Sequence, residues 1–227
     1  MVPLRFWPVG EFFRRSLFYP LALSTALCAV LFGGRMILSG SRNYDFLVWN
    51  LFLAWLPYLL ALWIVKLRRD EPRRGWKLGL AAILWALFLP NAPYIMTDFS
   101  HLLRAREFPL MYDIALIFAF AWTGLLLGLT SLHLLQGLVR NAWGRIAAAG
   151  FVAGATLLTG LGVYLGRFLR WNSWDVLRRP GTMLATMVVV IQNPMGHTFA
   201  WAHTLVFATV VLMCHLTLGA LRQGSRE

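Results

Sequence analysis

Charged residues are scarce in this chain. Only 13% of its 227 residues are Asp, Glu, Lys or Arg, whereas 59% are hydrophobic and the mean hydropathy is +0.64. Soluble domains carry about 25% charged residues, so this composition excludes a surface that is covered by water throughout. The 16 Phe, 11 Trp and 6 Tyr require burial and exclude intrinsic disorder. The composition therefore predicts a membrane protein that contacts the lipid bilayer.

Cysteine, acidic residues and familiar enzyme motifs are also scarce or absent. Cys28 and Cys214 each lie inside an apolar run, which excludes a disulfide framework and a cysteine metal centre. The net charge of +12 does not indicate nucleic acid here, because the basic residues fall between apolar runs, where they set orientation and contact anionic headgroups. The sequence contains no Gly-x-Ser-x-Gly, His-Glu-x-x-His or nucleotide-binding phosphate loop. We expect no cofactor, no metal and no nucleic-acid partner, and leave enzyme activity open.

Long apolar runs dominate what remains. A membrane crossing needs about 20 apolar residues, and six runs qualify: 17–38, 46–67, 78–96, 114–135, 146–166 and 199–221. A shorter run, 182–191, is predicted to form a helix in the membrane interface. No long linker or repeat divides the chain. We predict an all-α polytopic bundle of six transmembrane helices plus a short interfacial helix, in one integral membrane domain over residues 1–227.

The distribution of Lys and Arg predicts the orientation. Thirteen of the 21 basic residues lie on the side of the two termini and of the loop around 66–77, and eight lie on the other side, Arg35 among them. Because cytoplasmic loops carry the excess of Lys and Arg, we expect both termini to face the cytoplasm. The first run is too long for a cleaved secretory signal and carries Arg35 at its end, so we expect an uncleaved helix.

Small residues predict where helices pack closely. Gly150 and Gly154 lie four residues apart in the fifth run, as do Gly124 and Gly128 in the fourth. Small residues at this spacing let helix backbones approach one another. We expect the fourth and fifth runs to touch, and the same faces leave a homo-oligomer open.

The third run is interrupted by Pro90-Asn91-Ala92-Pro93 near its outer end. Each proline removes a backbone donor, and Asn91 is placed to supply a replacement. The interruption is either a turn at the end of a helix or the lining of a hydrated cavity. Asn91 is therefore a candidate ligand-binding residue.

Asp98 and His101 are the candidate catalytic residues. Thr97 is predicted to cap a short helix over 98–104, on which Asp98 and His101 share one face. An Asp–His pair can move a proton or, with a third ligand, hold a metal; it can also be a polar helix without chemistry. Asp113, at the start of the fourth run, is a further ligand candidate, although the helix dipole also favours a carboxylate there.

The segment 167–175 concentrates hydrogen-bond donors. Converging arginines suit an anion such as a phosphate, whereas Trp171 and Trp174 fit an aromatic membrane belt with stacked arginines. The candidate ligand-binding residues of this segment are Arg167, Arg170, Asn172, Ser173 and Asp175.

The strings PNAPYIMTDFSHL and YLGRFLRWNSWD, with RNYDFLVWN and MYDIALIFAFAWTG, resemble an uncharacterised bacterial membrane family, domain of unknown function 1361. The resemblance implies a multi-pass bacterial inner-membrane protein and supplies no activity. It implies these hallmark residues: Asn50, Asn91, Pro93, Asp98, His101, Asp113, Gly166, Arg167, Arg170, Trp171, Asn172 and Asp175.

These observations lead to one functional expectation with two alternatives. We expect binding or translocation of an anionic small molecule or lipid headgroup at a polar pocket on the extracytoplasmic side. The alternatives are a membrane-embedded enzyme acting on a lipid or polyprenyl phosphate, and a structural subunit of a membrane complex.

Overall fold

The computed structural model describes residues 16–70, 75–103, 109–171, 178, 180–193 and 195–224. Within these residues the chain is helical and contains no β-strand, as the composition predicts. The helices are α2 (Phe18–Ser39), α3 (Asp45–Asp70), α4 (Gly75–Phe88), α5 (Asn91–Tyr94), the 3₁₀ helix η2 (Ile95–Leu103), α6 (Leu110–Phe168), α8 (Pro180–Gln192) and α9 (Thr198–Gly224).

Five of the described helical segments are long and apolar enough to cross a membrane: α2, α3, the stretch Gly75–Leu102, α6 and α9. The 59 residues of α6 would measure about 90 Å if straight, far more than one crossing needs. Gly144 interrupts α6 with a non-helical backbone (φ 87°, ψ −177°) that glycine tolerates. The helix therefore divides into two arms, which correspond to the fourth and fifth predicted spans.

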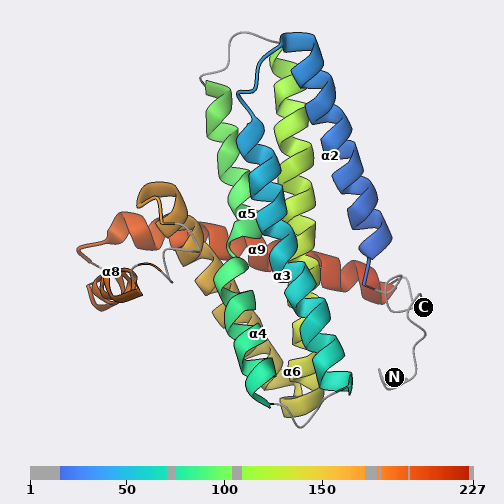
Figure 1. Ribbon diagram of the computed structural model, residues 1–227. Helices are drawn as coiled ribbons and strands as arrows, with labels where there is room; N and C mark the ends of the chain where they lie inside the picture. Colours follow the sequence, from blue (N-terminus) through green and yellow to red (C-terminus); the bar gives the residue numbers. More distant parts are fainter. Residues whose placement is uncertain are drawn as a thin grey trace.

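The two arms of α6 fold back on one another. A Cβ added to Gly128, on the first arm, would meet Ala92, and one added to Gly162, on the second arm, would meet Pro90. Positions on either side of Gly144 thus reach the same short segment. Figure 1 shows the two arms, light green and ochre, leaving a common turn, with the ochre arm leaning away to the left. Leu132 and Val152 belong to one buried cluster, so both arms contribute side chains to the same core.

Of the two glycine pairs that the spacing suggested, only Gly124 and Gly128 bring helices together. Gly150 and Gly154 are exposed, and a Cβ at either would meet nothing within 4 Å. The prediction that this pair packs against a helix was wrong, because spacing marks one face of a helix without fixing its direction. The close approaches occur at Gly124 and Gly128, against α5, and at Gly160, against the backbone of α9.

The last helix crosses the arms of α6 instead of running beside them (Figure 1). Near its beginning, the backbone of Thr204 lies against Gly160 on the second arm. Further along, Val211 packs with Leu125 and Leu129 on the first arm. The predicted short helix over 182–191 is present as α8, and Trp201 Nε1 of α9 donates to Val190 O at its end (2.9 Å).

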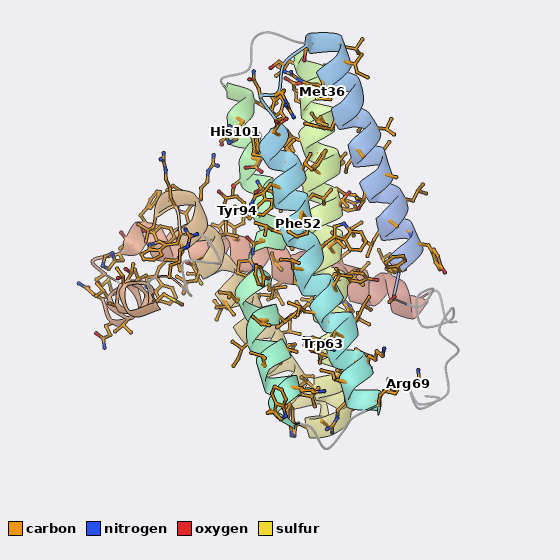
Figure 2. All side chains as sticks on the ribbon, viewed as in Figure 1. Met36, Phe52, Trp63, Arg69, Tyr94 and His101 are labelled. Atoms are coloured by element: carbon orange, nitrogen blue, oxygen red, sulfur yellow. The ribbon has the colours of Figure 1, made fainter. Side chains whose placement is uncertain are left out.

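Large apolar side chains cover the outside of the bundle. On α2, Leu23, Val30 and Ile37 are 74%, 70% and 80% exposed. Phe52 and Trp63, labelled on α3 in Figure 2, are also exposed. Water would penalise such a surface, whereas hydrocarbon tails would cover it. The described helices therefore form a membrane protein with an apolar outer surface.

Candidate functional site

The proline break ends α4 and turns the chain into η2. Asn91 Nδ2 donates to Phe88 O (3.0 Å), and Ala92 N donates to Leu89 O (3.2 Å). These bonds satisfy carbonyl groups at the end of α4. Asn91, predicted as a ligand-binding residue, thus uses a side-chain donor within its own segment and stabilises the break.

The helix after the break begins earlier than expected. Thr97 lies inside η2, and its Oγ1 donates to Tyr94 O (2.8 Å) instead of accepting from a following backbone N–H. The prediction of an N-cap at Thr97 was wrong. Pro90 and Pro93 hold φ near the helical value, so the chain resumes helical turns at Asn91.

Asp98 is the buried centre of a polar cluster formed by three elements. Its side chain is 2% exposed. Asn50 of α3 donates to Asp98 Oδ2 (2.9 Å), and Arg167 Nη1 from the second arm of α6 lies 3.8 Å from Oδ1. Arg167 also donates to Ser100 Oγ. The structure therefore brings together Asp98 and Arg167, two predicted site residues that lie far apart in the chain.

His101 lies at the edge of this cluster. Its Nε2 is 4.0 Å from Asp98 Oδ1, which is longer than a hydrogen bond. Its ring packs on Phe46, with centroids 4.5 Å apart. In Figure 2, His101 and Tyr94 lie along the same continuous helical segment, formed by α5 and η2. His101 is closer than Tyr94 to the end of the molecule where Met36 lies. The arrangement places an imidazole beside the Asp98 carboxylate without a direct hydrogen bond between them.

Asp113 belongs to a second polar cluster. Arg35 Nε and Nη2 of α2 lie 3.1 and 3.4 Å from the two carboxylate oxygens, and Tyr44 Oη donates to Oδ2 (3.0 Å). The Arg35 guanidinium also lies over the Tyr44 ring, 4.9 Å from its centroid. Burial, together with the hydrogen bond to the Asp113 carboxylate, raises the pKa of Tyr44 to about 12. Asp113 is thus paired with Arg35, whereas Arg167 pairs with Asp98.

Arg170 terminates the second arm of α6. It has a left-handed backbone (φ 56°), and Trp171 N donates to Leu165 O (3.2 Å), six residues back, which closes the end of the helix. Because α6 ends at Phe168, Trp171 lies beyond the helix and the helical stacking of Arg167 on Trp171 is not formed. Arg170 is exposed, and among the described residues it is Arg167 that reaches Asp98. Asn172, Ser173 and Asp175 lie outside the described residues.

A cavity of about 180 Å³ adjoins the Asp98 cluster. Its lining is almost wholly apolar, and it is shared by η2, the second arm of α6 and α9. The lining residues are Thr97, Val163, Tyr164, Arg167, Phe168, His203 and Phe207. Arg167 therefore connects a buried carboxylate with an apolar hollow.

Several partners in these clusters were not among the predicted site residues. Asn50 was named only through the family resemblance, and its signal is an amide within an apolar run. Arg35 was counted as a loop charge, although its side chain is only 3% exposed. The third ligand that a metal at Asp98 and His101 would need is not supplied by the described part of the chain, where no three His, Cys, Asp or Glu residues gather.

Comparison of the sequence with known protein families identifies one family that the chain matches. Residues 49–214 match the model of the family described as Protein of unknown function (DUF1361), and this range contains Asn50, Asp98, His101 and Arg167. The curated proteins and the solved structures contain no match to the chain. Since the match covers well over half of its residues, the chain belongs to the DUF1361 family.

Proposed function

We propose that this membrane protein binds an anionic group of the phosphate class, free or in a lipid headgroup, at Arg167. The observation that carries the proposal is the contrast between two arginine–aspartate pairs. Arg35 and Asp113 are buried together, with side chains 3% and 1% exposed. Arg167 keeps 26% of its side chain exposed beside an Asp98 that is 2% exposed.

The geometry of Arg167 supports a second, exchangeable partner. Its 3.8 Å separation from Asp98 is longer than the 3.1 Å contact between Arg35 and Asp113. A guanidinium has five N–H donors in a planar fork that matches carboxylate and phosphate oxygens. The described contacts use Nη1 and Nη2, toward Asp98 and Ser100. An approaching phosphate would engage the exposed part of the same fork.

Asp98 has the role of an orienting group in this proposal. Asn50 donates a hydrogen bond to the Asp98 carboxylate and holds it in place. The Asp98 carboxylate in turn positions the Arg167 guanidinium. His101, with an imidazole nitrogen 4.0 Å from the same carboxylate, would add a donor for the anion when protonated. Asn50, Asp98 and His101 thus prepare Arg167 and complete the site.

We further propose that the site opens on the extracytoplasmic side of a bacterial inner membrane, with both termini in the cytoplasm. The support is the excess of Lys and Arg on the side of the termini. Translocation of the anion goes beyond this proposal, because it needs a polar path from the site to the cytoplasmic side of the membrane.

The alternative of an enzyme acting on a lipid phosphate draws support from Asp98 and His101, which lie within 4.0 Å of one another. As acid and base they would act on a phosphate held by Arg167. Binding requires less than catalysis and uses the same residues, so we prefer the binding site as the function. Hydrolysis of a bound phosphate ester by the purified protein would show that the protein is an enzyme and not only a binding protein.

The binding site is tested with purified protein in phosphatidylcholine nanodiscs and hexyl phosphate as the probe. Isothermal titration calorimetry, corrected with empty nanodiscs, should show saturable binding to the wild type. Arg167→Gln should weaken it at least tenfold, which corresponds to about 1.4 kcal/mol. Arg140→Gln, at an exposed position on α6, is the matched control and should bind like the wild type. Equal affinity in the two variants would contradict the proposal.

A further inference from the structure

The cavity beside Arg167 has walls that suit hydrocarbon. Val163, which is 1% exposed, lines it together with the rings of Tyr164, Phe168 and Phe207. His203 Nδ1 lies 2.9 Å from Phe199 O of its own helix, so this nitrogen is directed to the α9 backbone. Apart from Arg167 and Thr97, such walls offer few polar partners to a hydrated ion.

The aromatic wall is braced by ring contacts. Phe168 meets the His203 ring edge-to-face at 4.7 Å and the Phe199 ring at 4.9 Å, and it lies 5.4 Å from Tyr164. These contacts join the end of α6 to the start of α9. The hollow is therefore lined by packed rings, and an apolar group can enter it without displacing a hydrogen-bonded polar wall.

The size of the cavity sets the size of its occupant. An apolar cavity of about 150 Å³ accepts benzene, so this half-open cavity of about 180 Å³ accommodates an apolar group of similar size, about six carbons. The cavity shares Arg167 with the Asp98 cluster, and Thr97 directly precedes Asp98. One ligand can thus place an anion on the guanidinium and a hydrocarbon segment in the hollow.

We propose, resting on the proposed anion site, that the natural ligand is a lipid phosphate whose first carbons enter this cavity. A free phosphate would contact Arg167 alone and leave the apolar walls without a partner. A lipid phosphate satisfies both, and its burial in the hollow adds about a fourfold gain in affinity for each buried CH₂. The ligand class is therefore an anionic amphiphile that reaches the site from the bilayer.

Chain length tests this inference. The wild type in phosphatidylcholine nanodiscs is titrated with inorganic phosphate, ethyl phosphate, hexyl phosphate and hexanol. We expect hexyl phosphate to bind at least thirtyfold more tightly than ethyl phosphate, and hexanol to bind far more weakly than hexyl phosphate. Equal affinities for inorganic, ethyl and hexyl phosphate would overturn the lipid inference and leave the anion site intact.

Variants separate the cavity from simple partitioning into the bilayer. Val163→Phe fills the hollow and should abolish the gain from ethyl to hexyl phosphate while ethyl phosphate still binds. Leu157→Phe, at a 42% exposed position on the same helix, is the matched control and should keep the gain. Phe207→Ala enlarges the hollow and should move the preference from hexyl to octyl phosphate, which keeps the test valid if Val163→Phe does not fold.

The remaining outcomes are equally decisive. A Val163→Phe variant that keeps the full chain-length gain would overturn the inference, since the hydrocarbon would then lie elsewhere. Failure of every phosphate to bind the wild type would overturn both the proposed function and the inference. Binding of hexanol as tight as that of hexyl phosphate would overturn the anion site at Arg167.

Discussion

Arg35 and Asp113 form a buried ion pair between α2 and α6, with Nε 3.1 Å from Oδ1. Tyr44, in the connection from α2 to α3, donates to the same carboxylate. Arg35 and Tyr44 precede the residues that match the family, and Asp113 lies within them. This pair therefore joins α2 to the part of the protein that matches the family.

Removal of one partner of the Arg35–Asp113 pair should strongly destabilise the protein. Arg35→Ala leaves a buried carboxylate without its cation, and such changes cost about 3–5 kcal/mol. The double variant Arg35→Met with Asp113→Leu should recover much of the loss. Denaturant unfolding in one detergent measures these values. Arg42→Ala, which breaks a largely exposed pair with Asp45, is the control and should have little effect.

Asp98 and Arg167 should be energetically coupled. Asp98→Asn and Arg167→Gln should each destabilise the fold, and the double variant should lose less than the sum by more than 0.5 kcal/mol, about the limit for independent sites. The sequence indicated Arg170 as a candidate ligand-binding residue together with Arg167. The cycle of Asp98→Asn with Arg170→Gln should be additive, and coupling there would place Arg170 in the site.

Arg170→Gly should stabilise the protein. A left-handed backbone costs a non-glycine residue about 1–2 kcal/mol, and glycine removes this cost at the end of a helix. We expect a higher unfolding midpoint and unchanged binding of hexyl phosphate. Loss of binding in a stabilised variant would show that the exposed Arg170 side chain contacts the ligand.

Gly160→Leu should separate α9 from α6. The α9 backbone at Thr204 lies where the new side chain would begin, and overpacking costs about 1–3 kcal/mol. Gly154→Leu lies on the same arm with nothing within 4 Å and should leave stability unchanged. The melting temperatures of the two variants in detergent test whether Gly160, and not Gly154, is a site of close helix packing. A destabilised Gly154→Leu variant would reveal a partner on that face, such as a second copy of the chain.

The orientation is tested with single cysteines in a background without Cys28 and Cys214. Asn43 lies between α2 and α3, and Asn141 lies beside the turn at Gly144. An impermeant thiol reagent should label Asn43→Cys in intact cells and Asn141→Cys only after lysis. The reverse pattern would place the termini outside and the Asp98 cluster on the cytoplasmic side.

The sequence predicted the helices well because length and apolarity decide whether a segment can cross a membrane. It predicted side-chain partners poorly, because burial shows that a polar group needs a partner without showing which one. Asn50 reaches Asp98 across 48 residues, and Arg35 reaches Asp113 across 78. Arg35 lies inside the first apolar run, which indicates that it needs a partner, but only the packing of α2 on α6 brings it to the Asp113 carboxylate.

The path of α9 across both arms of α6 has a consequence for biosynthesis. Its contact surface combines Leu125 and Leu129 on one arm with Gly160 on the other, so this surface exists only after the hairpin at Gly144 has closed. Translation supplies α9 after both arms, which matches this order. The cavity wall at His203 and Phe207 belongs to α9. The binding hollow is thus completed by a helix that emerges from the ribosome after both arms of α6, and we expect a chain stopped before Thr198 to insert its earlier helices without acquiring a ligand.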